Sequence, residues 1–72
     1  MTILIVDDHP IVLKGIHALM ASSFAEARIM DAAGLKEAEQ MLNRHKVDIL
    51  ITDLDLNGES GSMLIEHVRD VQ

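Results

Sequence analysis

Four aspartates that directly follow two apolar segments are the residues best suited to chemistry in this 72-residue chain. Asp7 and Asp8 follow the segment 2–6 (TILIV), while Asp53 and Asp55 follow 47–52 (VDILIT). Carboxylates held close together repel one another unless a cation lies among them. Mg²⁺ prefers such oxygen ligands and shares them with phosphate oxygens. Because a carboxylate can also attack phosphorus, we predict a magnesium-dependent phosphate-accepting site in which Asp53 takes the phosphoryl group.

The four aspartates converge only if the two apolar segments are neighbouring parallel strands. Continuous apolar strands are typical of parallel sheets covered on both faces, and a half-covered edge strand alternates apolar with polar residues. Strand patterns occupy 2–6, 27–32 and 47–52, and helical patterns begin at Pro10, near Gly34 and after Ser60. This alternation predicts an α/β fold with right-handed crossovers. With the first strand between the other two (order 2-1-3), both acidic strand ends lie where sites form in such sheets.

The first helix is predicted over Pro10–Ala21, with Asp8 or His9 at its N-cap and Pro10 in its first turn. Apolar residues recur in it at helical spacing, namely Val12, Ile16, Leu19 and Met20. Gly15 inside this helix costs about 1 kcal/mol relative to Ala. We therefore expect the helix to pack closely on the sheet at Gly15.

The second helix is predicted from one shared apolar face, made of Leu35, Ala38, Met41 and Leu42. The third is predicted after Ser60, which would cap it, with Leu64, Ile65 and Val68 on its apolar face.

Composition limits the classes of function. The net charge of −6, with 6 basic and 12 acidic residues, argues against binding of nucleic acid by this segment. The absence of cysteine excludes disulfides and thiolate metal sites within the chain. The apolar run at 3–6 is too short to span a membrane and ends in acids. We expect one small, soluble, cytoplasmic domain that makes no contact with a membrane.

Other polar residues have simpler explanations. Asp31 and Asp48 are expected to be merely solvated, because one belongs to an edge strand and the other begins a strand at the opposite rim. Gly58 and Gly61 are expected to form a turn, since the full dinucleotide-binding pattern is missing. Four histidines, His9, His17, His45 and His67, lie on separate elements without metal-ligand spacing. A histidine metal site or a histidine phosphorelay is therefore not favoured.

The stretches ILIVDDHPIVLKGI and DILITDLDLNGESG closely resemble the receiver domain of bacterial two-component response regulators. The DDHP opening is most similar to receivers that precede a helix-turn-helix DNA-binding domain. The resemblance implies a flavodoxin-like three-layer sheet, here truncated after three strand–helix units. Residues 1–72 would be the N-terminal part of a receiver domain without its last two strand–helix units.

The resemblance also implies roles for the aspartates. Asp53 would be the phosphoacceptor and a Mg²⁺ ligand, Asp8 a direct ligand, Asp7 a ligand through water, and Asp55 a ligand through its backbone carbonyl. The donor would be a phosphohistidine on a sensor histidine kinase. The module would not be an enzyme, and it would regulate transcription through a DNA-binding domain absent here.

The chain departs from the family pattern in three respects. Asn57 stands where the family usually has Pro, and Ser60 where an acid is common. A Ser or Thr and a Lys that contact the phosphoryl group belong to the two missing units, so we expect slow or weak phosphorylation. The third strand is left as an edge, which predicts pairing with another copy or with the missing half of the sheet.

Two other functions remain open from the sequence. Asp53-Leu54-Asp55 also fits a haloacid-dehalogenase-like phosphotransferase, with Asp53 as nucleophile and Asp55 as general acid. That family places its D-x-D after an early strand, and it gives Asp7 and Asp8 no role. The other alternative is a fragment that is not phosphorylated and serves only in interaction or dimerisation.

Overall fold

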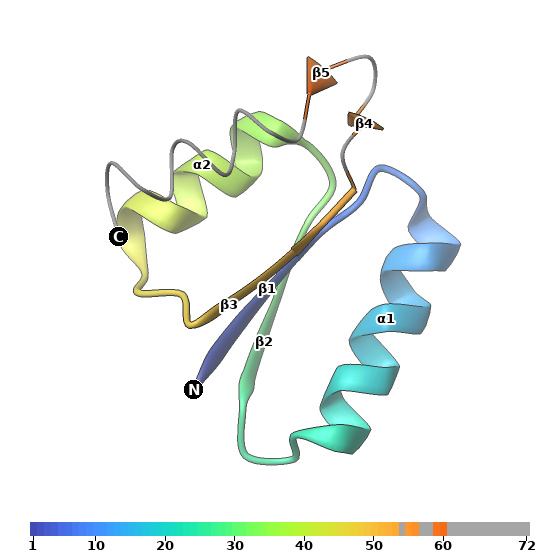
Figure 1. The fold of residues 1–72 in the computed structure, drawn as a ribbon, viewed down its shortest axis with the longest axis vertical. Coiled ribbons are helices and arrows are strands. Elements are labelled where there is room, and N and C mark those ends of the chain that lie inside the picture. Colours follow the sequence, from blue (N-terminus) through green and yellow to red (C-terminus); the bar gives the residue numbers. More distant parts are fainter. Residues whose placement is uncertain (54, 57–58, 61–72) are drawn as a thin grey trace.

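A central parallel strand flanked by two others organises the computed structural model, which describes residues 1–53, 55–56 and 59–60 (Figure 1). The elements in chain order are β1 (Thr2–Val6), α1 (Pro10–Ser23), β2 (Arg28–Ala32), α2 (Leu35–Arg44), β3 (Ile49–Thr52), β4 (Asp55–Leu56) and β5 (Glu59–Ser60). The third helix predicted after Ser60 lies outside the described residues. No helix in the described part is long and apolar enough to cross a membrane.

The sheet has the order β2-β1-β3, with both neighbours parallel to β1. Val6, the last residue of β1, is in register with Ala32 and with Thr52. Pairing continues one residue further, because the Asp7 N–H donates to Ala32 O (3.1 Å) and the Asp53 N–H donates to Val6 O (3.1 Å). The predicted strand order is therefore confirmed, and the carboxyl ends of β1 and β3 lie side by side.

The core forms because β1 is covered on both faces. Ile3, Leu4 and Ile5 have no exposed surface, and Val6 is 1% exposed. Leu4 and Val6 cluster with three residues of α2, as predicted: Leu35, Ala38 and Leu42. Successive strand side chains point to opposite faces, so Ile3 and Ile5 point to the side that α1 covers. The two helices accordingly flank the sheet as outer layers (Figure 1).

Helix α1 packs less tightly than the sequence suggested. It runs to Ser23 rather than Ala21, and none of its residues is buried. Val12 and Leu19 are 45% and 59% exposed. A Cβ placed on Gly15 would meet nothing within 4 Å, so the prediction of close helix-to-sheet packing there is wrong. The glycine simply lies on the solvent side of the helix.

Asp31 and Asp48 are not merely solvated, contrary to prediction. His17 Nδ1 lies 2.7 Å from Asp31 Oδ1 and so links α1 to β2. The Thr2 N–H donates to Asp48 Oδ2 (2.8 Å), at the end of the sheet opposite the other aspartates. Each carboxylate therefore joins two segments that are distant in sequence. A short antiparallel pair, β4 with β5, also occupies the region where only a turn was expected.

Candidate functional site

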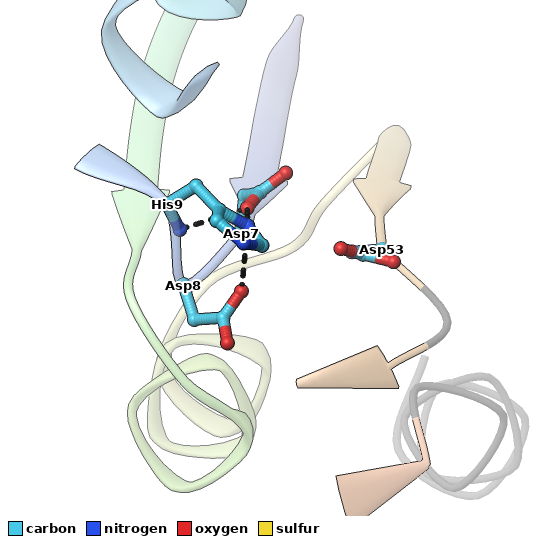
Figure 2. Close-up of side chains that lie close together, drawn as sticks. All are labelled: Asp7, Asp8, His9 and Asp53. Atoms are coloured by element: carbon cyan, nitrogen blue, oxygen red, sulfur yellow. Dashed lines mark hydrogen bonds and ion pairs between the residues drawn. The ribbon is translucent and has the colours of Figure 1, made fainter. Parts of the chain in front are cut away.

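Three of the predicted aspartates meet at the carboxyl end of the sheet. Asp7 and Asp8 leave β1, and Asp53 follows β3. Each offers one carboxylate oxygen, His9 offers a ring nitrogen, and these four atoms all lie within 4.8 Å of one another. Figure 2 shows the four side chains, with the His9 ring between the Asp7 and Asp8 carboxylates. The parallel register explains the meeting, because β1 and β3 end level with each other.

The side chains of the cluster differ in their access to solvent. Asp7 is buried, with only 7% of its surface exposed. The side chain of Asp8 is 14% exposed, whereas that of His9 is 65% exposed. The carboxylates of Asp7 and Asp8 are thus sheltered from solvent, whereas the imidazole of His9 is largely exposed.

His9 contacts both neighbouring carboxylates. Its backbone N–H donates to Asp7 Oδ1 (2.9 Å). Its ring Nδ1 lies 2.9 Å from Asp7 Oδ1 and 2.9 Å from Asp8 Oδ1. The hydrogen bond from the His9 backbone lowers the pKa of Asp7 against the opposing effect of burial, and the ring contributes further. The hydrogen bond to Asp7, followed by the charge of Asp8, raises the pKa of His9.

The donor set fits a small divalent cation. Opposite ligands of an octahedral ion with bonds of about 2.1 Å are roughly 4.2 Å apart. The ligand atoms of the cluster span no more than 4.8 Å, so small side-chain movements suffice to close it around an ion. Carboxylate oxygens are also the ligands that Mg²⁺ prefers. The residues present therefore suit the predicted cation.

Asp55 and the histidines differ in how they lie relative to the three clustered aspartates. Asp55 begins β4, opposite Ser60, and its role as a backbone-carbonyl ligand stays a prediction. That the four histidines form no metal site of their own stays a prediction, but His9 lies in the carboxylate cluster, which was not predicted. The available signal was its position directly after two aspartates at a strand end. Among the described residues, His17 and His45 lie outside the cluster.

Known proteins resemble most or nearly all of the chain. The family described as response regulator receiver domain matches residues 3–72. The chain is 27% identical over 71 residues to the Fimbriae Z protein of Salmonella typhimurium, covering 99% of the chain and 34% of that protein. It is 33% identical over 60 residues to the glycerol metabolism activator of Pseudomonas putida, covering 82% of the chain and 27% of that protein.

A third relative is the nitrate/nitrite response regulator protein NarP of Escherichia coli, which is 30% identical over 59 residues, covering 82% of the chain and 27% of that protein. The chain therefore spans about a third or less of the length of these curated relatives. No solved structure shows significant similarity to it.

Proposed function

The chain belongs to the response regulator receiver domain family, and from this premise we propose that Asp53 accepts a phosphoryl group from a sensor histidine kinase. In the transfer, a carboxylate oxygen of Asp53 attacks phosphorus as the phosphorus–nitrogen bond of the kinase phosphohistidine breaks. The imidazole leaves with the electron pair of that bond, and an aspartyl phosphate remains on this chain.

The neighbouring aspartates hold the divalent cation in this proposal. Asp8 and Asp53 bind it directly, Asp7 binds it through water, and Asp55 contributes its backbone carbonyl. Mg²⁺ held there supplies positive charge that offsets the repulsion between the acidic cluster and an incoming phosphoryl group. Asp7 and Asp8 are sheltered from solvent, which strengthens such electrostatic effects relative to water.

One observation carries the proposal: carboxylates from two different parallel strands offer oxygens within 4.8 Å of one another at the carboxyl end of the sheet. A strand-end aspartate alone is common in turns and helix caps. Capping would explain each aspartate singly, but it does not explain why Asp7, Asp8 and Asp53 from two separate strands meet at one place. The match to the receiver family over 3–72 supports the same assignment.

The output of the module is proposed to be regulation of transcription by a further domain of a longer protein. Two relatives are named as an activator and a response regulator. The matched region makes up only 27% of the length of each, so both contain much more chain than the part that resembles this one. The chain itself, with a net charge of −6, is not expected to contact nucleic acid.

Labelling with a small acyl phosphate tests the proposal. The chain is incubated with Mg²⁺ and the donor, and its intact mass is measured with time. We expect a single phosphate adduct that disappears in Asp53→Asn and persists in Asp31→Asn, a control with the same charge change outside the cluster. An adduct that survives Asp53→Asn would falsify the assignment of the phosphoacceptor.

The same experiment separates the other functions. Continuous release of phosphate that stops in Asp55→Asn identifies a phosphotransferase rather than a receiver. No adduct together with no Mg²⁺ binding leaves only an interaction role for the chain.

A further inference from the structure

We propose that His9 is an additional ligand of the metal site. Its ring nitrogen would make the site prefer first-row transition ions that bind imidazole well, such as Ni²⁺, over Mg²⁺. The inference rests on one part of the proposed function, namely that the Asp7, Asp8 and Asp53 carboxylates bind a divalent cation. It adds a nitrogen donor to a set of oxygen ligands. The His9 ring lies between the Asp7 and Asp8 carboxylates (Figure 2), and its nitrogen is within 4.8 Å of an oxygen of each of the three aspartates.

The distances around the ring nitrogen match those between adjacent metal ligands. His9 Nδ1 is 2.9 Å from Asp7 Oδ1 and 2.9 Å from Asp8 Oδ1. Adjacent ligands of an octahedral ion with bonds of about 2.1 Å are separated by roughly 3.0 Å. The ring nitrogen and the Asp8 oxygen therefore already have the spacing of two adjacent ligands of one ion. Asp53 supplies its oxygen from the neighbouring strand.

The chain holds the ring in this position by local means. His9 is the N-cap of α1, with φ −103° and ψ 107°, and Pro10 follows it. A residue before proline is confined to such extended conformations. The His9 N–H also donates to Asp7 Oδ1 (2.9 Å), which fixes the backbone to the same carboxylate that the ring contacts. Little ordering of the backbone is therefore needed for Nδ1 to bind an ion.

Ligand chemistry sets the direction of the selectivity. Carboxylate oxygens alone suit Mg²⁺, whereas imidazole nitrogen suits Ni²⁺, Zn²⁺ and Cu²⁺. Mg²⁺ keeps several waters and gains little from a nitrogen ligand. The side chain of His9 is 65% exposed, so it can turn outward when an ion prefers only oxygen. Loss of the ring should then affect Ni²⁺ strongly and Mg²⁺ weakly.

Calorimetric titrations of the chain with Ni²⁺ and with Mg²⁺ test the proposal. His9→Gln is compared with the unmodified chain and with His45→Gln, a matched control outside the cluster. We expect His9→Gln to weaken Ni²⁺ binding by about tenfold or more, while Mg²⁺ affinity changes less than about threefold. His45→Gln should leave the ratio of the two affinities unchanged.

A measurement on the unmodified chain makes the test independent of how the variant folds. On titration with Ni²⁺, the ring-proton NMR signals of His9 should show the large paramagnetic shifts of a directly bound imidazole. Undisturbed His9 signals, or equal changes in Ni²⁺ and Mg²⁺ affinity in His9→Gln, overturn the proposal. Failure of the proposed function looks different, because Asp53→Asn would then still be labelled, whatever the ratio of metal affinities.

Discussion

At the scale of single residues, the fold holds several negatively charged side chains close together at the site. Asp7, Asp8 and Asp53 bring three carboxylates to one place, and only His9 offers a compensating group within the described cluster. Like charges at such distances oppose ionisation of one another. A divalent cation should therefore stabilise the folded chain as well as serve its chemistry.

The first prediction follows from that repulsion. Adding Mg²⁺ at about 100 times its dissociation constant should raise the free energy of unfolding by roughly 2.7 kcal/mol, because the ion binds only the folded state. Asp8→Asn should abolish this gain and Asp31→Asn should retain it, as judged by thermal denaturation with and without Mg²⁺. An equal response of both variants to Mg²⁺ would show that the ion binds elsewhere.

The second prediction concerns pH in the absence of divalent cations. The pKa of His9 is raised above 6.5, so its contacts stabilise the fold below that pH and are lost as pH rises through the folded-state value. The pKa of Asp7 is lowered below 3.8, so its contribution is lost only as pH falls below that value. In a chelating buffer, melting temperature should decline above pH 6.5, and His9→Gln should flatten that decline. If the decline in melting temperature persists in His9→Gln and disappears in His45→Gln, then His45 rather than His9 causes it, and the prediction is wrong.

At the scale of elements, α1 is the least securely packed part of the fold. It has no buried residue, and its contact with β2 includes the pair of His17 with Asp31. Gly15 faces open space in the middle of this helix.

The third prediction uses the two glycines that the structure describes. Gly15→Ala should raise the free energy of unfolding by roughly 1 kcal/mol, because alanine is the better helix former and meets no neighbour. Gly34→Ala should instead lower it, because Gly34 is the N-cap of α2, where alanine is disfavoured. Thermal unfolding followed by circular dichroism measures both. A destabilising effect of Gly15→Ala would mean that a partner covers that face of α1.

The elements show why sequence patterns predict some contacts and miss others. Leu35, Ala38 and Leu42 were predictable because a strongly amphipathic helix has one way to face a sheet. Helix α1 is apolar around much of its surface, so periodicity did not identify its packed side. The cluster of Asp7, Asp8 and Asp53 followed from strand ends. The place of His9 depends on a side-chain rotation that no periodicity encodes.

At the scale of the whole molecule, the outer side of β3 has no neighbouring strand among the residues that the structure describes. In the part of the chain that the structure describes, β3 pairs within the sheet only with β1. Exposed strand edges bind other strands unless charge or cover prevents it. We propose that this edge is completed by another copy of the chain or by the rest of a longer receiver.

The fourth prediction follows for the 72-residue chain by itself. It should associate as concentration rises in sedimentation experiments, and Ile49→Lys should suppress association by placing charge on the edge strand. Ile49 is 37% exposed, so the substitution should leave the core intact. The control is Ile11→Lys on α1, at a side chain that is 87% exposed. If Ile11→Lys suppresses association and Ile49→Lys does not, the interface lies on α1 rather than on β3.

The central position of β1 has a consequence for biosynthesis. Both strands that pair with β1 come later in the chain, and the second ends at Thr52. At ribosomal speeds of about 5–20 residues per second, the apolar segment Ile3–Val6 waits roughly 2–9 s for that partner. During this interval the nascent polypeptide exposes an apolar segment with high β-propensity, to which chaperones can bind. The acids that end β1, Asp7 and Asp8, place charge beside it and so help keep it soluble.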